Sequence, residues 1–192
     1  GGSNTTAQAL YKLKNMHPTE YAAAASKAKL FTIHSTPEGQ DNGWKWIGDN
    51  IPETETIVNF SYNGTWDYWG DKNPYADEYK STAWLNTNVK NGHGPLGAKY
   101  AQDYVSEGDT PAFMALVANG LRAYEHPTFG GWGGRFLKDY SNVWVDAMEG
   151  GSIHTVIARW FPAAQNDFSA RMDWSVQPYG GANHHPRITI TG

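Results

Sequence analysis

The sequence predicts an α/β fold in which parallel strands are covered by helices. The first observation is the order of the expected elements over residues 5–61, which runs helix, helix, strand, loop, helix, strand and is typical of α/β layers. The second is composition, because 192 residues with 40% hydrophobic and 18% charged side chains can bury a core within one domain. No apolar run approaches the roughly 20 residues needed to cross a bilayer, so no membrane partner is expected.

Two helices are expected at the beginning of the chain, over residues 5–15 and 20–29. Ser3 or Asn4 can cap the first helix, whose apolar residues have broadly helical spacing, and Pro18 follows its end. The second helix is predicted from propensity, because a run of alanines fills its middle.

Two strands are expected next, over residues 30–34 and 54–61, because both segments are rich in residues that favour β-structure. A polar loop over residues 35–43 and a short helix over residues 44–50 connect them. This connection predicts parallel pairing of the two strands.

The remaining elements have weaker signals. Residues 62–97 are rich in Asn, Gly, Trp and Tyr without clear periodicity, which is typical of a segment that builds a binding site. Helices are expected over residues 112–121, 155–161 and 163–174, the last two separated by Pro162, and a final strand is expected over residues 187–191.

Charge and cysteine content exclude several classes of function. The chain has 15 Lys and Arg against 19 Asp and Glu, a net charge of −4, so binding to nucleic-acid phosphates is not expected. The absence of cysteine excludes disulfides, a thiolate nucleophile and cysteine-bound zinc. Neither a G-x-S-x-G motif nor a phosphate-binding glycine motif occurs in the expected structural context.

Aromatic residues are unusually frequent, with nine Trp and eleven Tyr beside 21 Gly. Rings next to flexible loops suit stacking on a sugar or a base, and burial in the core is the alternative for each of them. One hypothesis is therefore a non-catalytic module that binds plant cell-wall polysaccharide through Trp44, Trp66, Trp69, Trp84 and Trp132. A structural domain with mostly buried rings is a further possibility.

Polar residues near predicted loops and helix starts are the remaining candidates. Asn166 and Asp167 are expected to open a helix after Pro162, where Asp167 would either ligate a hard cation such as calcium or act as an N-cap. Glu107 and Asp109 precede a helix and would either hold sugar hydroxyls or cap that helix.

Two loop segments are candidates for contact with a ligand. Asn91 and His93 lie among glycines, where the backbone can approach a ligand closely, although a loop histidine is often simply exposed. Trp132 lies between two pairs of glycines and is interpreted as a rigid ring held in a flexible turn.

Four segments together carry a resemblance to a known family: GGSNTTAQAL at residues 1–10, SEGDTP at 106–111, EHPTFGGWGGR at 125–135 and NDFSARMDW at 166–174. Over nearly its whole length the chain resembles the nucleoside-hydrolase-like domain of bacterial proteins described as cellulose-binding. The resemblance implies a Rossmann-like, nucleoside-hydrolase-type parallel sheet with flanking helices and a site at the carboxyl ends of the strands. It also implies a sugar or nucleoside-like ligand, or a polysaccharide, and a secreted or periplasmic protein.

The resemblance assigns roles to individual residues. In nucleoside hydrolases a calcium ion binds the ribose hydroxyls and a water molecule, which a carboxylate deprotonates. Asp167 matches a calcium ligand, and Asn4 lies near a position whose carbonyl completes the metal shell. Asn166 occupies the place of a catalytic histidine, and Glu107 and Asp109 match two residues that hold the sugar.

The N-terminal aspartate cluster of nucleoside hydrolases, D-x-D-x-x-x-D-D, does not occur in this sequence. We therefore expect residues 1–192 to be the C-terminal two thirds of a single domain, with an incomplete sheet. The implied activity is hydrolysis of N-glycosyl or ribosyl bonds. It is expected to be absent from this chain alone, because calcium would bind only to the complete domain.

Overall fold

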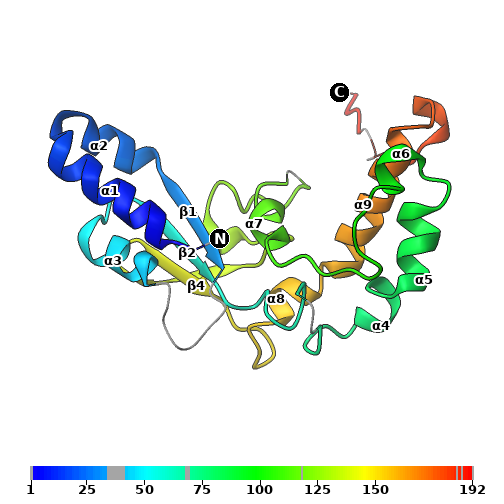
Figure 1. Cartoon of the computed structure of the whole chain (residues 1–192), viewed down its shortest axis with the longest axis horizontal. Coiled ribbons are helices and arrows are strands. Elements are labelled where there is room, and N and C mark those ends of the chain that lie inside the picture. The colour runs from blue at the N-terminus through cyan, green and yellow to red at the C-terminus, as the bar shows by residue number, and fades with distance from the viewer. Residues whose placement is uncertain are drawn as a thin grey trace. The chain divides into compact units, whose positions relative to one another are not determined.

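The computed structural model describes residues 2–33, 42–67, 70–117, 119–184, 186 and 188–191. The chain divides into two compact units, which are described separately. The first combines Gly1–Pro74 with Glu107–Trp160, and the second combines Tyr75–Ser106 with Phe161–Gly192. Figure 1 labels the helices and strands.

A four-stranded mixed sheet forms the centre of the first unit. Its strands are β1 (Lys29–Ile33), β2 (Glu55–Asn59), β4 (Val143–Asp146) and β3 (Phe136–Tyr140), in that spatial order. β1 pairs in parallel with β2, and β2 with β4, whereas β3 is antiparallel to β4. The α/β class and the parallel pairing of the first two strands are confirmed, and β3 and β4 are strands that the sequence analysis did not anticipate.

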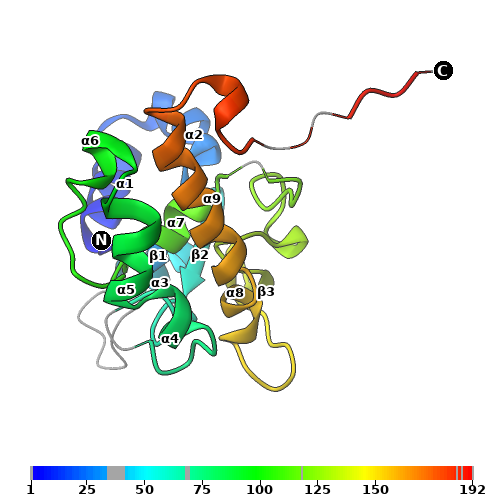
Figure 2. The same ribbon diagram turned by 90° about the vertical axis from the view of Figure 1, so that its right-hand side faces the viewer.

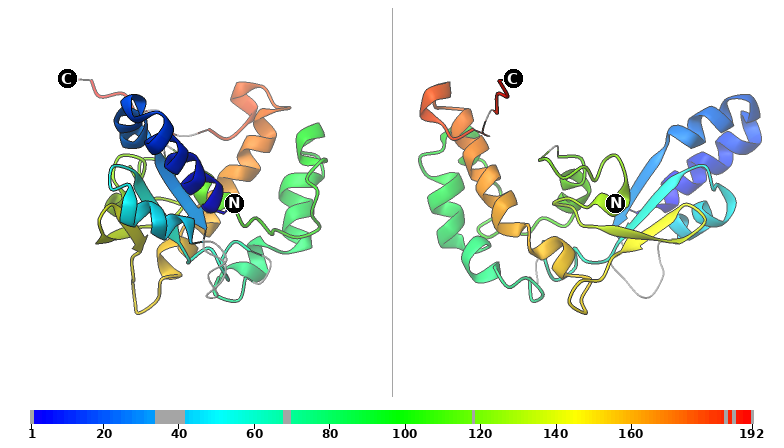
Figure 3. Two further views of the ribbon diagram at one scale, coloured as in Figure 1. Left: turned by 60° about the vertical axis from the view of Figure 1, so that its left-hand side comes forward. Right: turned by 180° about the vertical axis from the view of Figure 1, so that it is seen from behind.

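Three helices pack together beside this sheet: α1 (Asn4–Met16), α2 (Pro18–Lys27) and α3 (Gly43–Asn50), of which α3 contacts β2. The right-hand view of Figure 3 shows these blue and cyan helices next to the strands. Their shared core contains Ala7, Leu10, Ala25, Ile47 and Ile51, against which Leu30 of β1 packs. The bounds of α1 and α3 agree with the predicted segments to within one residue. By contrast, α2 begins and ends two residues earlier than predicted, and the chain enters β1 at Lys29.

The segment that contains α7 (Thr110–Met114) packs near β1 and against the glycine-rich loop. A Cβ atom on Gly133 would lie 2.3 Å from the carbonyl oxygen of Pro111, so only glycine allows α7 to pack this closely. The helix predicted over residues 112–121 is shorter than expected, because α7 ends at Met114. Further along the chain, the Asn119 side chain accepts a hydrogen bond from the Leu121 N–H at 3.0 Å, which favours a turn there.

A tight hairpin joins β3 to β4 through Ser141 and Asn142. Ser141 has a φ of 49° and is the only non-glycine residue with a positive φ in the described part of the chain. Two-residue hairpin loops with a positive φ at the first central position usually place glycine there.

The second unit is helical. It contains α4 (Ala76–Tyr79), α5 (Thr82–Leu85), the π-helix η1 (Asn86–Lys90), α6 (Gly94–Gly97) and α9 (Phe161–Trp174). Figure 2 shows α5 and α9 in this unit, and α9 contacts α4, α6 and η1. Short helices thus occupy part of the segment predicted to be irregular. Pro162 lies in the first turn of α9, where a missing N–H costs nothing.

The short helix α8 (Thr155–Ala158) belongs to the first unit, and it ends earlier than the helix predicted over residues 155–161. The strand predicted over residues 187–191 is wrong for residues 188–191, which form no strand in the described structure.

Candidate functional site

The carboxyl ends of β2 and β4 meet at a buried carboxylate, Asp146, which is 9% exposed. In the parallel register Val58 pairs with Val145, so the residues that follow, Asn59 and Asp146, project from the same face of the sheet. The Asn59 side-chain amide donates a hydrogen bond of 2.9 Å to Asp146 Oδ1. This contact fixes the ends of both strands relative to each other.

Asp146 also organises the turn that follows β2. The Ser61 hydroxyl donates to Asp146 Oδ1 at 2.7 Å, and the backbone N–H groups of Phe60 and Ser61 donate to Oδ2 at 2.5 and 3.0 Å. Burial raises the pKa of Asp146, and these donors oppose that effect because they favour the ionised form. With four donors around its two oxygens, this carboxylate positions the backbone of the site.

A pocket of about 440 Å³ lies beside this turn. The described residues that line it are Asn63, Gly64, Asp71, Lys72 and His154. The Nδ1 atom of His154 lies 3.2 Å from the carbonyl oxygen of Ser61, so the imidazole is held by the same turn that Asp146 organises. Ligand sites of open α/β sheets characteristically lie outside the carboxyl ends of the strands, which is where this pocket is found.

The charged groups of the pocket are paired. Lys72 Nζ lies 2.7 Å from Asp71 Oδ2. The hydrogen bond from Lys72 lowers the pKa of Asp71 despite partial desolvation, and the nearby His154 lowers it further. Gly64 has a φ of 78°, and a Cβ there would lie 2.6 Å from Lys72 Cγ, so glycine lets the Lys72 stem pack against this turn. The pocket therefore offers hydrogen-bonding groups with no net charge from Asp71 and Lys72.

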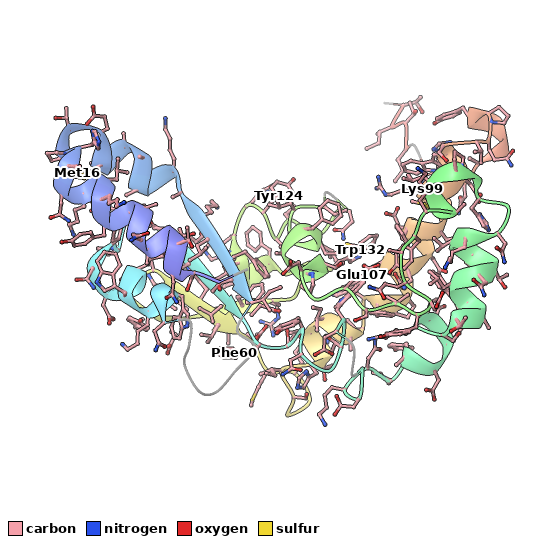
Figure 4. The ribbon with its side chains drawn as sticks, viewed as in Figure 1. Met16, Phe60, Lys99, Glu107, Tyr124 and Trp132 are labelled. Atoms are coloured by element: carbon pink, nitrogen blue, oxygen red, sulfur yellow. The ribbon has the colours of Figure 1, made fainter. Side chains whose placement is uncertain are left out.

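The predicted sugar-binding loop lies next to the turn after β2. The Glu107 N–H donates to the carbonyl oxygen of Trp66 at 2.9 Å, and Glu107 Oε2 accepts from the Thr110 hydroxyl at 2.8 Å. Asp109 is exposed at the start of α7, and its side chain makes no capping hydrogen bond. Figure 4 labels Glu107 and Trp132, both close to α7. Their roles in sugar binding stay predictions.

The tryptophans do not form the exposed binding strip that the sequence suggested. Trp66 is 1% exposed and Trp132 is 7% exposed, so the expectation of accessible rings is wrong for these two. Trp44 and Trp84 are half-buried, and Trp69 lies outside the described residues. Large rings gain most from burial in the core, which explains why Trp66 and Trp132 are inside.

The second unit holds the other candidates. His93 is enclosed by partners, because Nδ1 lies 2.6 Å from Asp173 Oδ1 and Nε2 lies 2.8 Å from the Thr87 carbonyl oxygen. Burial lowers the pKa of His93, but the bonds to Thr87 and Asp173 outweigh it and leave the pKa raised. Asn91 is exposed and follows the π-helix.

Asn166 and Asp167 do not open a helix, because α9 begins at Phe161 and continues through both residues. Asp167 Oδ2 accepts a hydrogen bond of 2.6 Å from Arg171, one turn further along α9. Asn4 is the exposed first residue of α1 in the first unit, whereas Asp167 belongs to the second. Their roles in catalysis and calcium binding remain predictions.

The predicted calcium site requires an oxygen-rich set of ligands. Within the described ranges, no three or more His, Asp or Glu side chains are grouped so as to hold a metal ion. Calcium takes six to eight oxygen ligands, several of them carboxylates. The described residues therefore do not fit a calcium site by themselves.

Comparison with known families identifies the chain. Residues 1–136 match the model of a family described as "Cellulose-binding Sde182, nucleoside hydrolase-like domain". The chain belongs to this family. The match to the Sde182 domain ends at the start of β3, so Asp146, His154 and the expected match over residues 166–174 lie beyond it. Comparisons with curated proteins and with solved structures gave no match.

Six residues of this site were not singled out from the sequence: Asn59, Asn63, Asp71, Lys72, Asp146 and His154. A signal for Asp146 is present in the sequence, since Val-Trp-Val-Asp at residues 143–146 is a β-prone run that ends in a carboxylate. His154 has no comparable signal, because only the folded turn brings it to Ser61. No helix in the described ranges has the length and apolarity needed to cross a membrane.

Proposed function

We propose that this Sde182-family domain binds polysaccharide without cleaving it, and that the pocket at the carboxyl ends of β2 and β4 contacts the sugar. The observation that carries the proposal is the lining of this pocket, which presents an amide, a paired carboxylate and ammonium, and an imidazole. These groups can donate and accept hydrogen bonds, as neutral sugar hydroxyls require. The family's description as cellulose-binding supports this ligand class.

The binding function is tested on the whole chain. The wild-type protein is expected to sediment with insoluble cellulose and to release no soluble sugar. His154→Ala and Asn63→Ala are expected to weaken binding of soluble cello-oligosaccharides by about fivefold to tenfold, because each loses a hydrogen-bonding group. Lys12→Ala, an exposed change on α1, is the control. Absence of binding by the wild type, or unchanged titrations for both pocket variants, contradicts the proposal.

A hydrolase is the second candidate. The pocket places a carboxylate, Asp71, and an imidazole, His154, at the carboxyl edge of the sheet, and such groups can transfer protons in glycosyl transfer to water. Assays with nucleosides and aryl glycosides test this function. Turnover that His154→Ala abolishes without loss of folding would favour the hydrolase over the binding module.

We also propose that the protein acts outside the cytoplasm, secreted or in the periplasm, because plant cell-wall polysaccharide is found outside the cell. Fractionation of the native host, followed by immunodetection, tests this proposal. Detection only in the cytoplasm would contradict it.

A further inference from the structure

An exposed aromatic ring lies on the glycine-rich segment of the first unit. Phe129 is 55% exposed and ends the 3₁₀-helix η2 (Pro127–Phe129). The start of this helix is fixed by buried Pro127 and by the hydrogen bond from the Thr128 N–H to His126 Nδ1, at 3.3 Å. Gly130 ends it with a φ of 76°, a conformation that favours glycine. The ring is therefore held on a constrained backbone although it is open to solvent.

Polar side chains surround this ring. The Arg122 guanidinium carbon lies 5.8 Å from the centre of the Phe129 ring. Arg122 donates two hydrogen bonds to the Glu125 carboxylate, one of them from Nε at 2.7 Å. Tyr124 precedes Glu125 in the chain and is 44% exposed. Figure 4 labels Tyr124 on its loop near α7. A ring, a guanidinium and a carboxylate thus form one connected group, and the exposed phenol of Tyr124 comes from the same loop.

The segment that carries this group contacts the sheet. His126, which caps η2, makes an edge-on contact with Trp144 of β4, with ring centres 5.1 Å apart. The following loop is closed by two backbone hydrogen bonds between Gly131 and Gly134. A pre-formed surface loses little conformational entropy on binding, which favours contact with a rigid ligand.

The charge of the group indicates which ligand it fits. Arg122 and Glu125 neutralise each other, so the surface has no excess charge to attract nucleic acid or an acidic or basic peptide. A flat ring flanked by donors and acceptors matches a pyranose, which has an apolar C–H face and hydroxyls at its edge. The uncharged ligand class fits the cellulose-binding description of the family.

We infer that Phe129, with Arg122, Tyr124 and Glu125, forms a carbohydrate-contacting surface in which the Phe129 ring stacks on a sugar of a neutral β-linked glucan chain. This inference rests on the proposed polysaccharide-binding function and adds a second contact to the pocket near His154. The surface gives adhesion to an extended chain, whereas the pocket contacts a single sugar.

The test compares retention on insoluble cellulose among variants with unchanged circular dichroism spectra. Phe129→Ala is expected to weaken adsorption about tenfold, because the stacking face is lost. Phe129→Tyr is expected to retain it. The matched control is Phe113→Ala, since Phe113 is 65% exposed on α7 and has no ring or cation contact among the described interactions.

The outcomes separate this surface from the pocket. Loss for Phe129→Ala with normal adsorption of Phe113→Ala supports the inference. Equal adsorption of Phe129→Ala and wild type overturns the inference and leaves the proposed function intact. Equal loss of adsorption for Phe129→Ala and Phe113→Ala would show general apolar adhesion and would also overturn the inference. Binding of the wild-type protein to uncharged protein-coated beads would show a protein-binding surface and would likewise overturn the inference. If the wild type binds no glucan, the proposed function and the inference both fail.

Discussion

The side-chain amide of Asn59 donates to the carboxylate of Asp146 across 87 residues of sequence, at 2.9 Å. This hydrogen bond joins the ends of two neighbouring parallel strands, and the same carboxylate holds the turn that leads to the pocket. Stability and binding at this edge of the sheet are therefore expected to depend on one residue.

Asp146→Asn is expected to lower the free energy of unfolding of the first unit by about 2–4 kcal/mol. The amide that replaces the carboxylate has only one oxygen that accepts hydrogen bonds. Its NH₂ group would face N–H or O–H donors that now bond to the second carboxylate oxygen, and these donors would lose their partner. Urea unfolding of wild type and variant measures the difference. Asp139→Asn, an exposed change on β3, is the control and is expected to have little effect. Equal losses in both variants would show that Asp146 has no special role.

Stability of the second unit is expected to depend on pH through His93. Its pKa in the folded protein is raised above 6.5, so the protonated ring stabilises the fold. This contribution is complete below pH 6.5 and is lost as the pH rises through the folded-state pKa. NMR titration of the His93 ring is expected to give a midpoint above 6.5, and Asp173→Asn is expected to lower it. A midpoint at or below 6.5 in the wild type would contradict the ion pair.

Gly133→Ala is expected to destabilise the first unit by about 2–3 kcal/mol. The new methyl group would lie 2.7 Å from the Ala115 nitrogen as well as close to the Pro111 carbonyl, so α7 would have to move. Thermal unfolding followed by circular dichroism measures the loss. Gly180→Ala is the matched control, because no atom lies within 4 Å of a Cβ at that position. A variant as stable as the control would mean that α7 accommodates the methyl group.

Adsorption to cellulose is expected to be insensitive to salt. Arg122 and Glu125 form a paired, solvent-exposed group, so binding through the Phe129 surface relies on stacking and hydrogen bonds to neutral hydroxyls. Depletion assays in low salt and in about 0.5 M sodium chloride, where charges are screened beyond a few ångströms, compare the two conditions. A severalfold loss in high salt would instead indicate attraction between charges.

Calcium is expected to leave the stability of this chain unchanged. A ligand at a hundred times its Kd raises the free energy of unfolding by about 2.7 kcal/mol, which is readily visible as a higher Tm. The described residues group no set of carboxylates for the ion, and Asp167 is paired with Arg171. Equal melting curves with calcium and with a chelator are the expected result. A clear rise in Tm that Asp167→Asn abolishes would restore the predicted calcium role of this residue.

The helices and strands before residue 61 were predictable because local signals agree with the packing. The alanine run and the β-branched segments each specify one element, and α1 to α3 bury the apolar positions expected of them. The predicted cap of the first helix is wrong, because Ser3 makes no side-chain capping hydrogen bond and its hydroxyl accepts from the Trp44 N–H instead. β3 was missed because exposed Leu137, Lys138 and Asp139 give it no apolar alternation. Nothing local distinguishes such an edge strand from a loop.

The site was less predictable than the fold. Glu107 was identified from its loop, and its hydrogen bond to the Trp66 carbonyl, which places it near the turn after β2, is a long-range contact without a sequence signal. Trp132 was expected to face a ligand because it lies among glycines. In the structure the Trp132 side chain is buried, and the neighbouring Gly133 packs closely on α7. In both cases tertiary packing decided the position of the side chain.

The hairpin between β3 and β4 offers a means of making the protein more robust for biochemistry. Ser141 adopts a positive φ that carries a steric cost for a residue with a Cβ atom. Replacement of Ser141 by glycine would remove this steric cost, and Ser141 belongs to neither of the proposed ligand-binding sites. A Ser141→Gly variant with a higher Tm would then serve as the parent protein in which destabilising substitutions are studied without aggregation.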